Sequence, residues 1–385
     1  MKVALVHDWL TGMRGGEKCL EVFCRLFPDA DIFTLVHKAG SVSPTIENHR
    51  IHTSFLQSFP YIDRTYRYYL PLMPFAIRKL DLSGYDFILS SSHAVAKGIR
   101  IPEGSLHICF CHTPMRYLWD RYADYFGRQN TGLITSLVMR LLAPALRRWD
   151  VRSNSAVDCF IANSHYVQKR IEQYYDRSST VIHPPVDDKF YAPMNAEKGD
   201  FFLIVSALSP YKRVDLAVEA FNELGYPLVV VGEGPLAHKL SQSAGSNIRF
   251  TGWLSDEEVR LHYARCRALI FCGEEDFGIT PLEAQAMGRP VVAYGRGGVL
   301  ETILPDRTSW TPETGIALEK TTRPTGVFFH RQSADSLVSA VKNFETLENR
   351  FEPAWIRRHA IQFGLENFSK RVRLFIEERL QSHRC

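Results

Sequence analysis

The 385-residue sequence lacks an apolar run long enough to cross a membrane, and it lacks a Cys-x-x-Cys pair. A spanning helix needs about 20 consecutive apolar residues, and no uninterrupted run approaches that length. Residues 1–6 lead straight into a strand-like segment, which predicts no signal peptide and a soluble cytoplasmic protein. The eight cysteines include no Cys-x-x-Cys pair, so they indicate reduced, buried thiols and neither a disulfide framework nor a zinc site.

The sequence also lacks the Gly-x-Gly-x-x-Gly spacing of dinucleotide-binding folds. The glycine turn after its first strand-like run, Arg14-Gly15-Gly16-Glu17, has a different spacing. This argues against a nicotinamide or flavin enzyme, and we expect no cofactor. The net charge of +4 is too small to indicate a nucleic-acid partner. No internal repeat or low-complexity tract is evident.

What the sequence does contain is strand-like runs alternating with helix-like runs, twice over. This alternation predicts an α/β protein with two doubly wound parallel sheets, one in a domain at residues 1–190 and one at 200–362. A proline-containing segment at 183–186 and a polar stretch to residue 200 form the expected linker. The expected strands are at 3–6, 31–36, 87–91, 107–111, 159–163 and 180–182, then at 202–206, 228–231, 248–250, 268–272, 291–293 and 326–328.

The most informative segment begins just after the expected strand at 268–272. Residues 275–283 read Glu-Asp-Phe-Gly-Ile-Thr-Pro-Leu-Glu, and a helical apolar pattern starts at the proline. Gly278 to Thr280 therefore lie at a helix N-terminus, where free N–H groups and the helix dipole favour a diphosphate. Glu275 and Glu283 would repel phosphate, so we interpret them as acceptors for sugar hydroxyls. The alternative is two acids that only stabilise the helix start.

This motif, with seven residues between the two glutamates, closely resembles the donor motif of retaining GT-B glycosyltransferases of family four. The resemblance implies two Rossmann-like domains that face each other across a cleft, with a C-terminal helix at about 363–385 crossing back to the first domain. It also implies that Glu275 contacts the transferred sugar and that Glu283 contacts the nucleotide ribose. The residues between them that we assign to the donor are Phe277, Gly278, Ile279 and Thr280.

A basic loop follows the expected strand at 202–206. Its Lys212 is placed to neutralise a diphosphate, whose charge grows as it departs in the transition state. The loop resembles the basic donor loop of the family, although many members have an arginine where this chain has Ala207. Arg213 is the candidate substitute, and the alternative is that both cations are solvated loop charges. Gly234 lies in a Gly-Glu-Gly turn that resembles the loop lining the nucleotide base.

The first domain contributes a glycine turn and a histidine to the resemblance. Gly15 and Gly16 resemble the family's glycine pair under the diphosphate. His112, in His-Thr-Pro at a strand end, is assigned to the donor sugar near the reacting carbon, whereas a lone strand-end histidine would be structural. The turn that begins at Asn163 is a weaker candidate of the same kind. The Asp-x-Asp at 29–31 begins a strand instead of ending one, as expected of a metal-independent GT-B enzyme, so no metal ligands are assigned.

The function implied is transfer of a sugar from a nucleotide diphosphate to a hydroxyl with retention of configuration, the leaving diphosphate accepting the proton. Residues 112–120 and 210–215 look like those of bacterial surface-polysaccharide mannosyltransferases, which favours GDP-mannose as the donor and a glycan or glycolipid as the acceptor. UDP-sugars stay open, as do a nucleotide-sugar 2-epimerase and a non-catalytic sugar-nucleotide binding protein.

Two segments raise the question of a membrane. Residues 61–79 combine Tyr, Phe, Pro and Arg, and residues 133–152 combine Leu, Ile and Val with Arg. Both suit a peripheral contact with the inner face of the cell membrane, and both equally suit ordinary packing helices. A lipid-linked acceptor is therefore a hypothesis.

Overall fold

The computed structural model describes residues 1–384 except 128–131, 313–314 and 316–321. Its internal contacts divide the chain into two compact units. Unit 1 comprises residues 1–184 together with the C-terminal segment from Phe368, and unit 2 comprises Pro185–Asn367. The polar stretch before residue 200 therefore belongs to unit 2.

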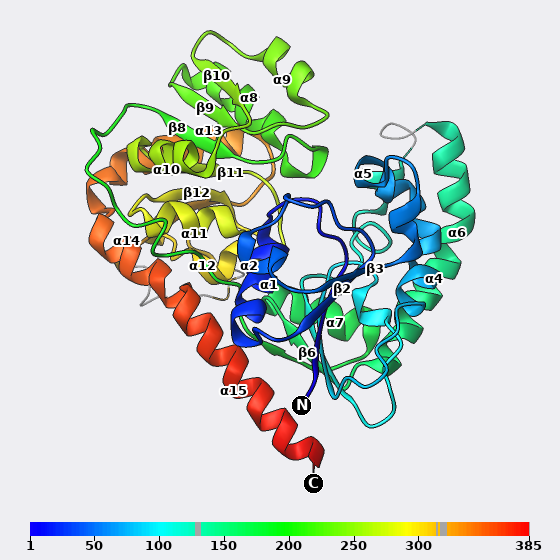
Figure 1. Cartoon of the computed structure of the whole chain (residues 1–385). Coiled ribbons are helices and arrows are strands. Elements are labelled where there is room, and N and C mark those ends of the chain that lie inside the picture. Colours follow the sequence, from blue (N-terminus) through cyan, green and yellow to red (C-terminus); the bar gives the residue numbers. More distant parts are fainter. Residues whose placement is uncertain (128–131, 313–314, 316–321, 385) are drawn as a thin grey trace. The chain divides into compact units, whose positions relative to one another are not determined.

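Unit 1 is built on a parallel sheet of seven strands in the order β3-β2-β1-β4-β5-β6-β7 (Figure 1). Six of these strands are predicted by the sequence and are confirmed. The seventh, β3, was missed because its Ile-His-Thr sequence is short and half-buried, so it gives no apolar run. The strands are β1 (Val3–His7), β2 (Asp31–Thr34), β3 (Ile51–Thr53), β4 (Phe87–Ser92), β5 (Leu106–Cys111), β6 (Cys159–Ala162) and β7 (Ser179–Val181).

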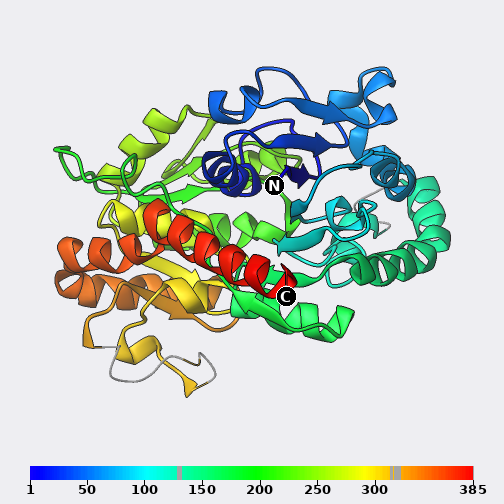
Figure 2. The same ribbon diagram turned by 60° about the horizontal axis from the view of Figure 1, so that its bottom comes forward.

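Helices connect these strands and pack on the sheet. Those of unit 1 are α1 (Gly15–Leu26), α2 (Pro44–Glu47), α3 (Ile62–Thr65), α4 (Met73–Arg78), α5 (Tyr122–Phe126), α6 (Leu133–Arg152) and α7 (His165–Tyr175), with the 3-10 turns η1 (Phe55–Ser58), η2 (Tyr66–Leu72), η3 (Ala96–Gly98) and η4 (Ser153–Ala156). The long C-terminal helix α15 (Leu365–Arg384), red in Figure 2, continues into unit 1. There the Phe368 ring packs against Phe23 and Phe110 at centroid distances of 5.9 and 5.7 Å.

Two fully buried carboxylates fix the loops of unit 1. Asp8, directly after β1, accepts four backbone N–H groups from residues 93–96 at 2.6 to 2.9 Å. Asp150 of α6 pairs with the buried ammonium of Lys97 at 2.8 Å and accepts from Trp119 and Tyr175. Because a buried charge is costly unless it is paired and hydrogen-bonded, these contacts hold η3 and α6 in place.

Unit 2 is built on a parallel sheet of six strands in the order β10-β9-β8-β11-β12-β13. All six are predicted by the sequence and are confirmed. They are β8 (Phe202–Val205), β9 (Leu228–Val231), β10 (Ile248–Gly252), β11 (Leu269–Phe271), β12 (Val291–Tyr294) and β13 (Gly326–Phe329). The connecting segments are η5 (Pro210–Lys212), α8 (Val214–Leu224), α9 (Ala237–Ser243), α10 (Asp256–Arg265), α11 (Ile279–Ala286), α12 (Val299–Thr302), η6 (Arg307–Ser309), α13 (Ala334–Leu347), η9 (Glu348–Arg350), α14 (Pro353–Ala360) and η10 (Ile361–Phe363).

The sheet of unit 2 buries both faces, as a doubly wound sheet requires. Alternate residues of one strand enter different core clusters: Phe202 and Ile204 pack with α8 and α13, whereas Leu203 packs with α10 and α11. This explains why the strands read as continuous apolar runs in the sequence. The described cysteines are free, and all but Cys159 are buried. None of the helices in the described part of the chain is long and apolar enough to cross a membrane.

A buried histidine on β5 predicts how the stability depends on pH. His107 is fully buried, with Ser90 Oγ 2.8 Å from Nε2 and Nδ1 donating to the Ala156 carbonyl at 2.6 Å. Burial lowers the pKa of His107 to about 4. Since an unfolded histidine titrates near 6.5, the unfolded chain binds more protons below that pH, and the stability contributed by neutral His107 is lost as the pH falls from about 6.5 towards 4.

We expect His107 alone to lower the free energy of unfolding by about 2 kcal/mol between pH 8 and pH 5. Urea unfolding followed by circular dichroism at each pH measures this loss. The His107→Gln variant should be less stable throughout, but its stability should fall less steeply with decreasing pH. Equal pH slopes for the two proteins would contradict the expectation.

Candidate active site

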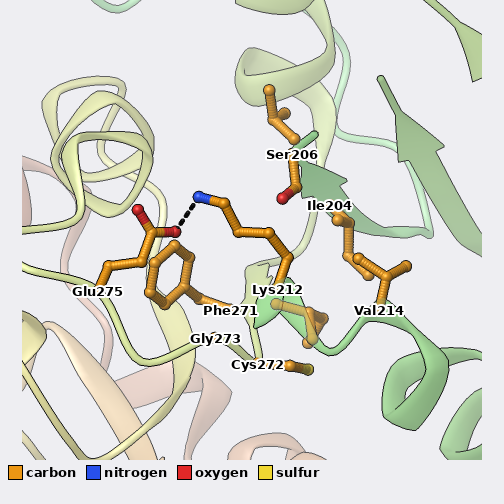
Figure 3. Close-up of a pocket in the computed structure, with 10 residues that line it drawn as sticks. Ile204, Ser206, Lys212, Val214, Phe271, Cys272, Gly273 and Glu275 are labelled. Atoms are coloured by element: carbon orange, nitrogen blue, oxygen red, sulfur yellow. Dashed lines mark hydrogen bonds and ion pairs between the residues drawn. The ribbon is translucent and has the colours of Figure 1, made fainter. Parts of the chain in front are cut away.

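The two candidate catalytic residues of unit 2 meet in an ion pair (Figure 3). Lys212 ends η5 after β8, and Glu275 follows the neighbouring strand β11. The Lys212 ammonium donates to Oε1 of Glu275, and each of the two side chains is 17% exposed. Parallel strands end at the same edge of a sheet, so residues 63 positions apart in the sequence come into contact.

A glycine turn holds the backbone of Glu275. Gly297 forms a parallel bridge with Glu275, and the N–H of Gly298 donates to the Glu275 carbonyl at 2.8 Å. A Cβ atom on Gly297 would lie 2.4 Å from that carbonyl oxygen, and the φ of Gly297 is +78°. This turn thus has a definite structural task, because only glycine lets the two backbones approach this closely.

Helix α11 begins at Ile279, as the proline pattern predicts to within two residues. Its N-cap is Gly278 with φ +85°, and Ile279 and Thr280 are half-buried in the first turn. The backbone N–H groups there precede the helical hydrogen-bond ladder, so they remain available to an anion. The preceding Phe277 is buried in the core cluster shared with α10, which anchors the turn.

Glu283, one turn into α11, is only 5% exposed. Its Oε2 accepts a hydrogen bond from the Tyr263 hydroxyl of α10 at 2.9 Å. Burial, followed by the charge of Glu283, raises the pKa of both Tyr263 and Tyr191, so these hydroxyls stay protonated as donors. The carboxylate of Glu283 is therefore held in one orientation by its tyrosine partner.

The other basic residue of the loop, Arg213, points to different partners. It occupies the left-handed region at φ +53° and caps α8. Its guanidinium donates to Asp215 at 3.1 Å and to Gln332 at 3.2 Å. Ala207, where many family members have arginine, is exposed on the same loop. Lys212 and Arg213 are thus adjacent in sequence but engaged with separate acceptors.

Gly234 lies where the loop after β9 packs on the loop after β8. A Cβ atom there would lie 2.5 Å from the carbonyl oxygen of Leu208, and Leu208 N donates to the Glu233 carbonyl at 2.8 Å. The glycine is therefore required by the contact between the two loops. That contact fixes the loop that carries Lys212.

In unit 1 the structure brings Gly16 and His112 together. A Cβ atom on Gly16 would lie 3.4 Å from Cε1 of His7 and 3.7 Å from Nε2 of His112. The neighbouring Gly15 has nothing within 4 Å of its Cβ position, so packing inside the chain does not demand a glycine there. The glycine turn after β1 and the end of β5 thus form one local group.

Sequence reasoning missed a polar network around His112. Ser91 Oγ lies 2.8 Å from Nε2 of His112 and 3.0 Å from Nδ1 of His7, and His7 Nε2 lies 3.7 Å from Glu17. His7 and Ser91 are partners in the β1–β4 register, so the register of parallel strands was the signal that could have found them. The lower-ranked Asn163 also belongs here, since its amide donates to the His112 carbonyl at 2.8 Å.

The environment of His112 keeps its ring neutral. Burial, followed by the neighbouring histidines His93 and His7, lowers the pKa of His112 to about 3. Glu17 behaves differently: burial opposes its ionisation, but His7, His93 and a backbone N–H group together outweigh burial and leave the pKa of Glu17 below its usual range. At neutral pH His112 thus acts as a hydrogen-bonding group, and the ionised Glu17 lies three contacts away, through Ser91 and His7.

No group of three or more His, Cys, Asp or Glu side chains is placed to hold a metal ion among the residues that the structure describes. Unit 2 offers instead an ammonium, two carboxylates and a helix N-terminus, and unit 1 by itself offers a neutral imidazole. Such groups can bind a phosphate and several hydroxyls.

Family models match both parts of the chain. The model described as "Glycosyltransferase Family 4" matches residues 13–190, and the model described as "Glycosyl transferases group 1" matches residues 186–358. The O-antigen chain mannosyltransferase C of Escherichia coli is 31% identical over 191 residues, which cover 45% of this chain and 50% of the relative. A mycobacterial protein, named as a GDP-mannose-dependent alpha-(1-6)-phosphatidylinositol monomannoside mannosyltransferase in Mycolicibacterium smegmatis, is 30% identical over 195 residues, 43% of this chain and 50% of the relative. The chain spans about half the length of these relatives.

The fold also matches that of a solved structure over nearly the whole chain. The Anabaena protein HepE, crystallised with UDP, superposes with a TM-score of 0.69 at 15% identity, covering 98% of this chain and 100% of HepE. Three observations agree with one another: the two parallel-sheet α/β units, the family models that together run from residue 13 to 358, and the match to this solved structure. The chain therefore belongs to the group 1 and family 4 glycosyltransferases, and its fold is GT-B.

Proposed function

We propose that this glycosyltransferase moves mannose from GDP-mannose to a hydroxyl of a lipid-linked glycan in the synthesis of a cell-surface polysaccharide. The observation that carries the proposal is the contact between Lys212 and Glu275, next to the start of α11. It puts a cation for a diphosphate beside a carboxylate for sugar hydroxyls. The names of the two relatives, an O-antigen mannosyltransferase and a GDP-mannose-dependent enzyme acting on a phosphatidylinositol mannoside, support the choice of donor and acceptor.

The donor diphosphate is assigned to Lys212 and to the N–H groups of Ile279 and Thr280. Negative charge grows on this group as the bond from the anomeric carbon to the diphosphate oxygen breaks, so a fixed ammonium and a helix N-terminus stabilise the transition state more than the ground state. The acceptor oxygen forms the new bond on the same face, and its proton passes to the leaving diphosphate. The configuration is retained, and neither a side-chain base nor a metal ion is assigned.

The carboxylates and His112 are assigned to recognition of the donor. Glu275 accepts hydroxyls of the transferred sugar, and Glu283 accepts those of the ribose, since its orientation is already fixed by Tyr263. Phe277, Gly278 and Gly234 shape the loops that receive the donor. Neutral His112 hydrogen-bonds to the sugar, with Gly15 and Gly16 giving the diphosphate close access to the backbone.

Binding of the donor requires the ion pair to open. The cavity that Lys212 and Glu275 line together measures only about 10 Å³, which is about the space of one water molecule. The phosphate and the sugar hydroxyls would replace the contact between the two side chains, each with a partner of its own. We therefore propose that the ion pair keeps both charges compensated while the donor is absent.

We also propose that the domain at residues 200–362 binds the donor and that the domain at residues 1–190 serves the acceptor.

The first test compares donors on the wild type and on Glu275→Gln, without added metal. We expect GDP-mannose, rather than other GDP-sugars or UDP-sugars, to raise the melting temperature of the wild type and to be slowly hydrolysed to free mannose. Glu275→Gln should reduce hydrolysis about 100-fold or more, because an oriented charged acceptor for the sugar is lost. Preference for a UDP-sugar would overturn the assignment of GDP-mannose as the donor. An epimerised sugar product would indicate an epimerase, and donor binding without turnover would indicate a binding protein.

The second test separates the two loop cations. Lys212→Met should lower kcat/KM for the donor about 100- to 1000-fold, with most of the effect on kcat, because the ammonium stabilises charge that develops in the transition state. Arg213→Met is the matched control, and we expect at most about a tenfold loss, since its guanidinium is already shared with Asp215 and Gln332. Equal losses in steady-state assays would show that Arg213 supplies the second phosphate cation, and the reverse order would contradict the role of Lys212.

A further inference from the structure

A surface groove in unit 1 takes no part in the site described above. It has a volume of about 600 Å³ and lies between the end of α4, the segment after η3 and the C-terminal half of α6. Four of its lining residues are arginines, namely Arg78, Arg100, Arg148 and Arg152, and none of the lining residues is acidic. Figure 1 shows α4 and α6, which contribute to the same core cluster.

The positive charge of this groove is not neutralised within the described part of the chain. Arg78, Arg100 and Arg152 form no ion pair there, and Arg148 donates only to the Pro144 carbonyl of its own helix, at 3.3 Å. Asp81 interacts electrostatically with Arg100, but its carboxylate is already hydrogen-bonded to Ser83. The one acid of α6, Asp150, is fully buried and compensated by Lys97.

This charge arrangement has an energetic cost without an anion. Arg148 and Arg152 are four residues apart on α6, where like charges repel. All four arginines are exposed and line one concave surface. The planar guanidinium groups match the oxygens of a phosphate in pairs, so a phosphate group is the chemistry that this groove fits.

The same helix carries an exposed apolar stripe. Leu133, Leu137 and Leu141 are 71%, 60% and 72% exposed, and their four-residue spacing places them on one face. Continuing along that face by seven and then four residues leads to Arg148 and Arg152. One exposed face of α6 thus changes from apolar at its N-terminal half to basic at its C-terminal half, a combination typical of helices that lie in a membrane interface.

We propose that the arginine groove binds the phosphate of anionic lipid headgroups while the leucine stripe of α6 enters the adjoining apolar layer. The occupant is a lipid and not a free phosphate, because the basic groove and the apolar stripe share one helix face. The proposal rests on the lipid-linked acceptor of the proposed function, to which this surface would bring the enzyme, and it does not depend on which sugar is transferred.

The test measures sedimentation of the full chain with phosphatidylcholine vesicles and with vesicles that contain about one third phosphatidylglycerol. We expect binding to the anionic vesicles only. Arg148→Gln/Arg152→Gln should weaken it at least tenfold, because basic residues near an anionic surface supply the attraction. The matched control removes two exposed helix cations of unit 2, Lys239→Gln/Lys342→Gln, and should bind as the wild type does.

A second pair of variants separates a lipid from a soluble phosphate. Leu137→Ser/Leu141→Ser should abolish the part of the binding that survives 0.5 M salt, since that part comes from apolar insertion. Unchanged vesicle binding in the arginine variant would overturn the proposal. So would complete competition by millimolar pyrophosphate with no effect of the leucine variant, or binding of an acidic peptide but not of vesicles.

Circular dichroism melting of each variant excludes unfolding as the cause of lost binding. Donor hydrolysis is assayed separately in solution and should be equal in the wild type and the arginine variant. If the wild type hydrolyses the donor but does not bind anionic vesicles, the lipid site has failed. If the wild type binds anionic vesicles but hydrolyses no donor, the proposed transferase has failed.

Discussion

Parallel pairing of the strands is the constraint on which the candidate residues of each unit depend. In each unit every strand ends at the same edge of the sheet, so the parallel direction of the strands alone brings residues that follow different strands to one edge. His7, Ser91 and His112 converge in this way in unit 1. Lys212 and Glu275 do so in unit 2. The price of this geometry is that the converging groups are polar and largely buried, and each has to find a partner.

The partners come largely from the backbone and from single opposite charges. Asp8 is stabilised by four backbone N–H groups, and Asp150 by the ammonium of Lys97 together with two hydroxyl or indole donors. Glu283 depends on Tyr263. Removal of one partner from such a group leaves an uncompensated buried charge, which costs more than the contact itself contributes. These contacts fix the segments that carry the partner groups.

The same argument accounts for where the surface differs from the core. The arginines of the groove in unit 1 are exposed, so their mutual repulsion is tolerated in water, and the buried charge of Asp150 on the same helix is matched by Lys97. Helix α6 therefore combines a neutralised inner face with an outer face that is basic at one end and apolar at the other. Its sequence, read alone, was equally typical of a packing helix and of a membrane-interface helix, and the structure adds that its side chains Leu133, Leu137, Leu141, Arg148 and Arg152 are exposed.

The sequence by itself determined the sheets, because buried parallel strands are apolar on both faces and stand out as continuous runs. It also determined the motif at Glu275 and the start of α11, since proline and glycine act locally on the backbone. It did not reveal β3, whose short half-buried sequence carries no apolar run. Only the tertiary structure decided that Lys212 pairs with Glu275, that Arg213 pairs with Asp215, and that Gly297 is there for the backbone of Glu275. These contacts join residues from separate strands and loops. Which residues meet depends on the direction of the side chains and on the packing of the loops, and no local sequence pattern encodes either.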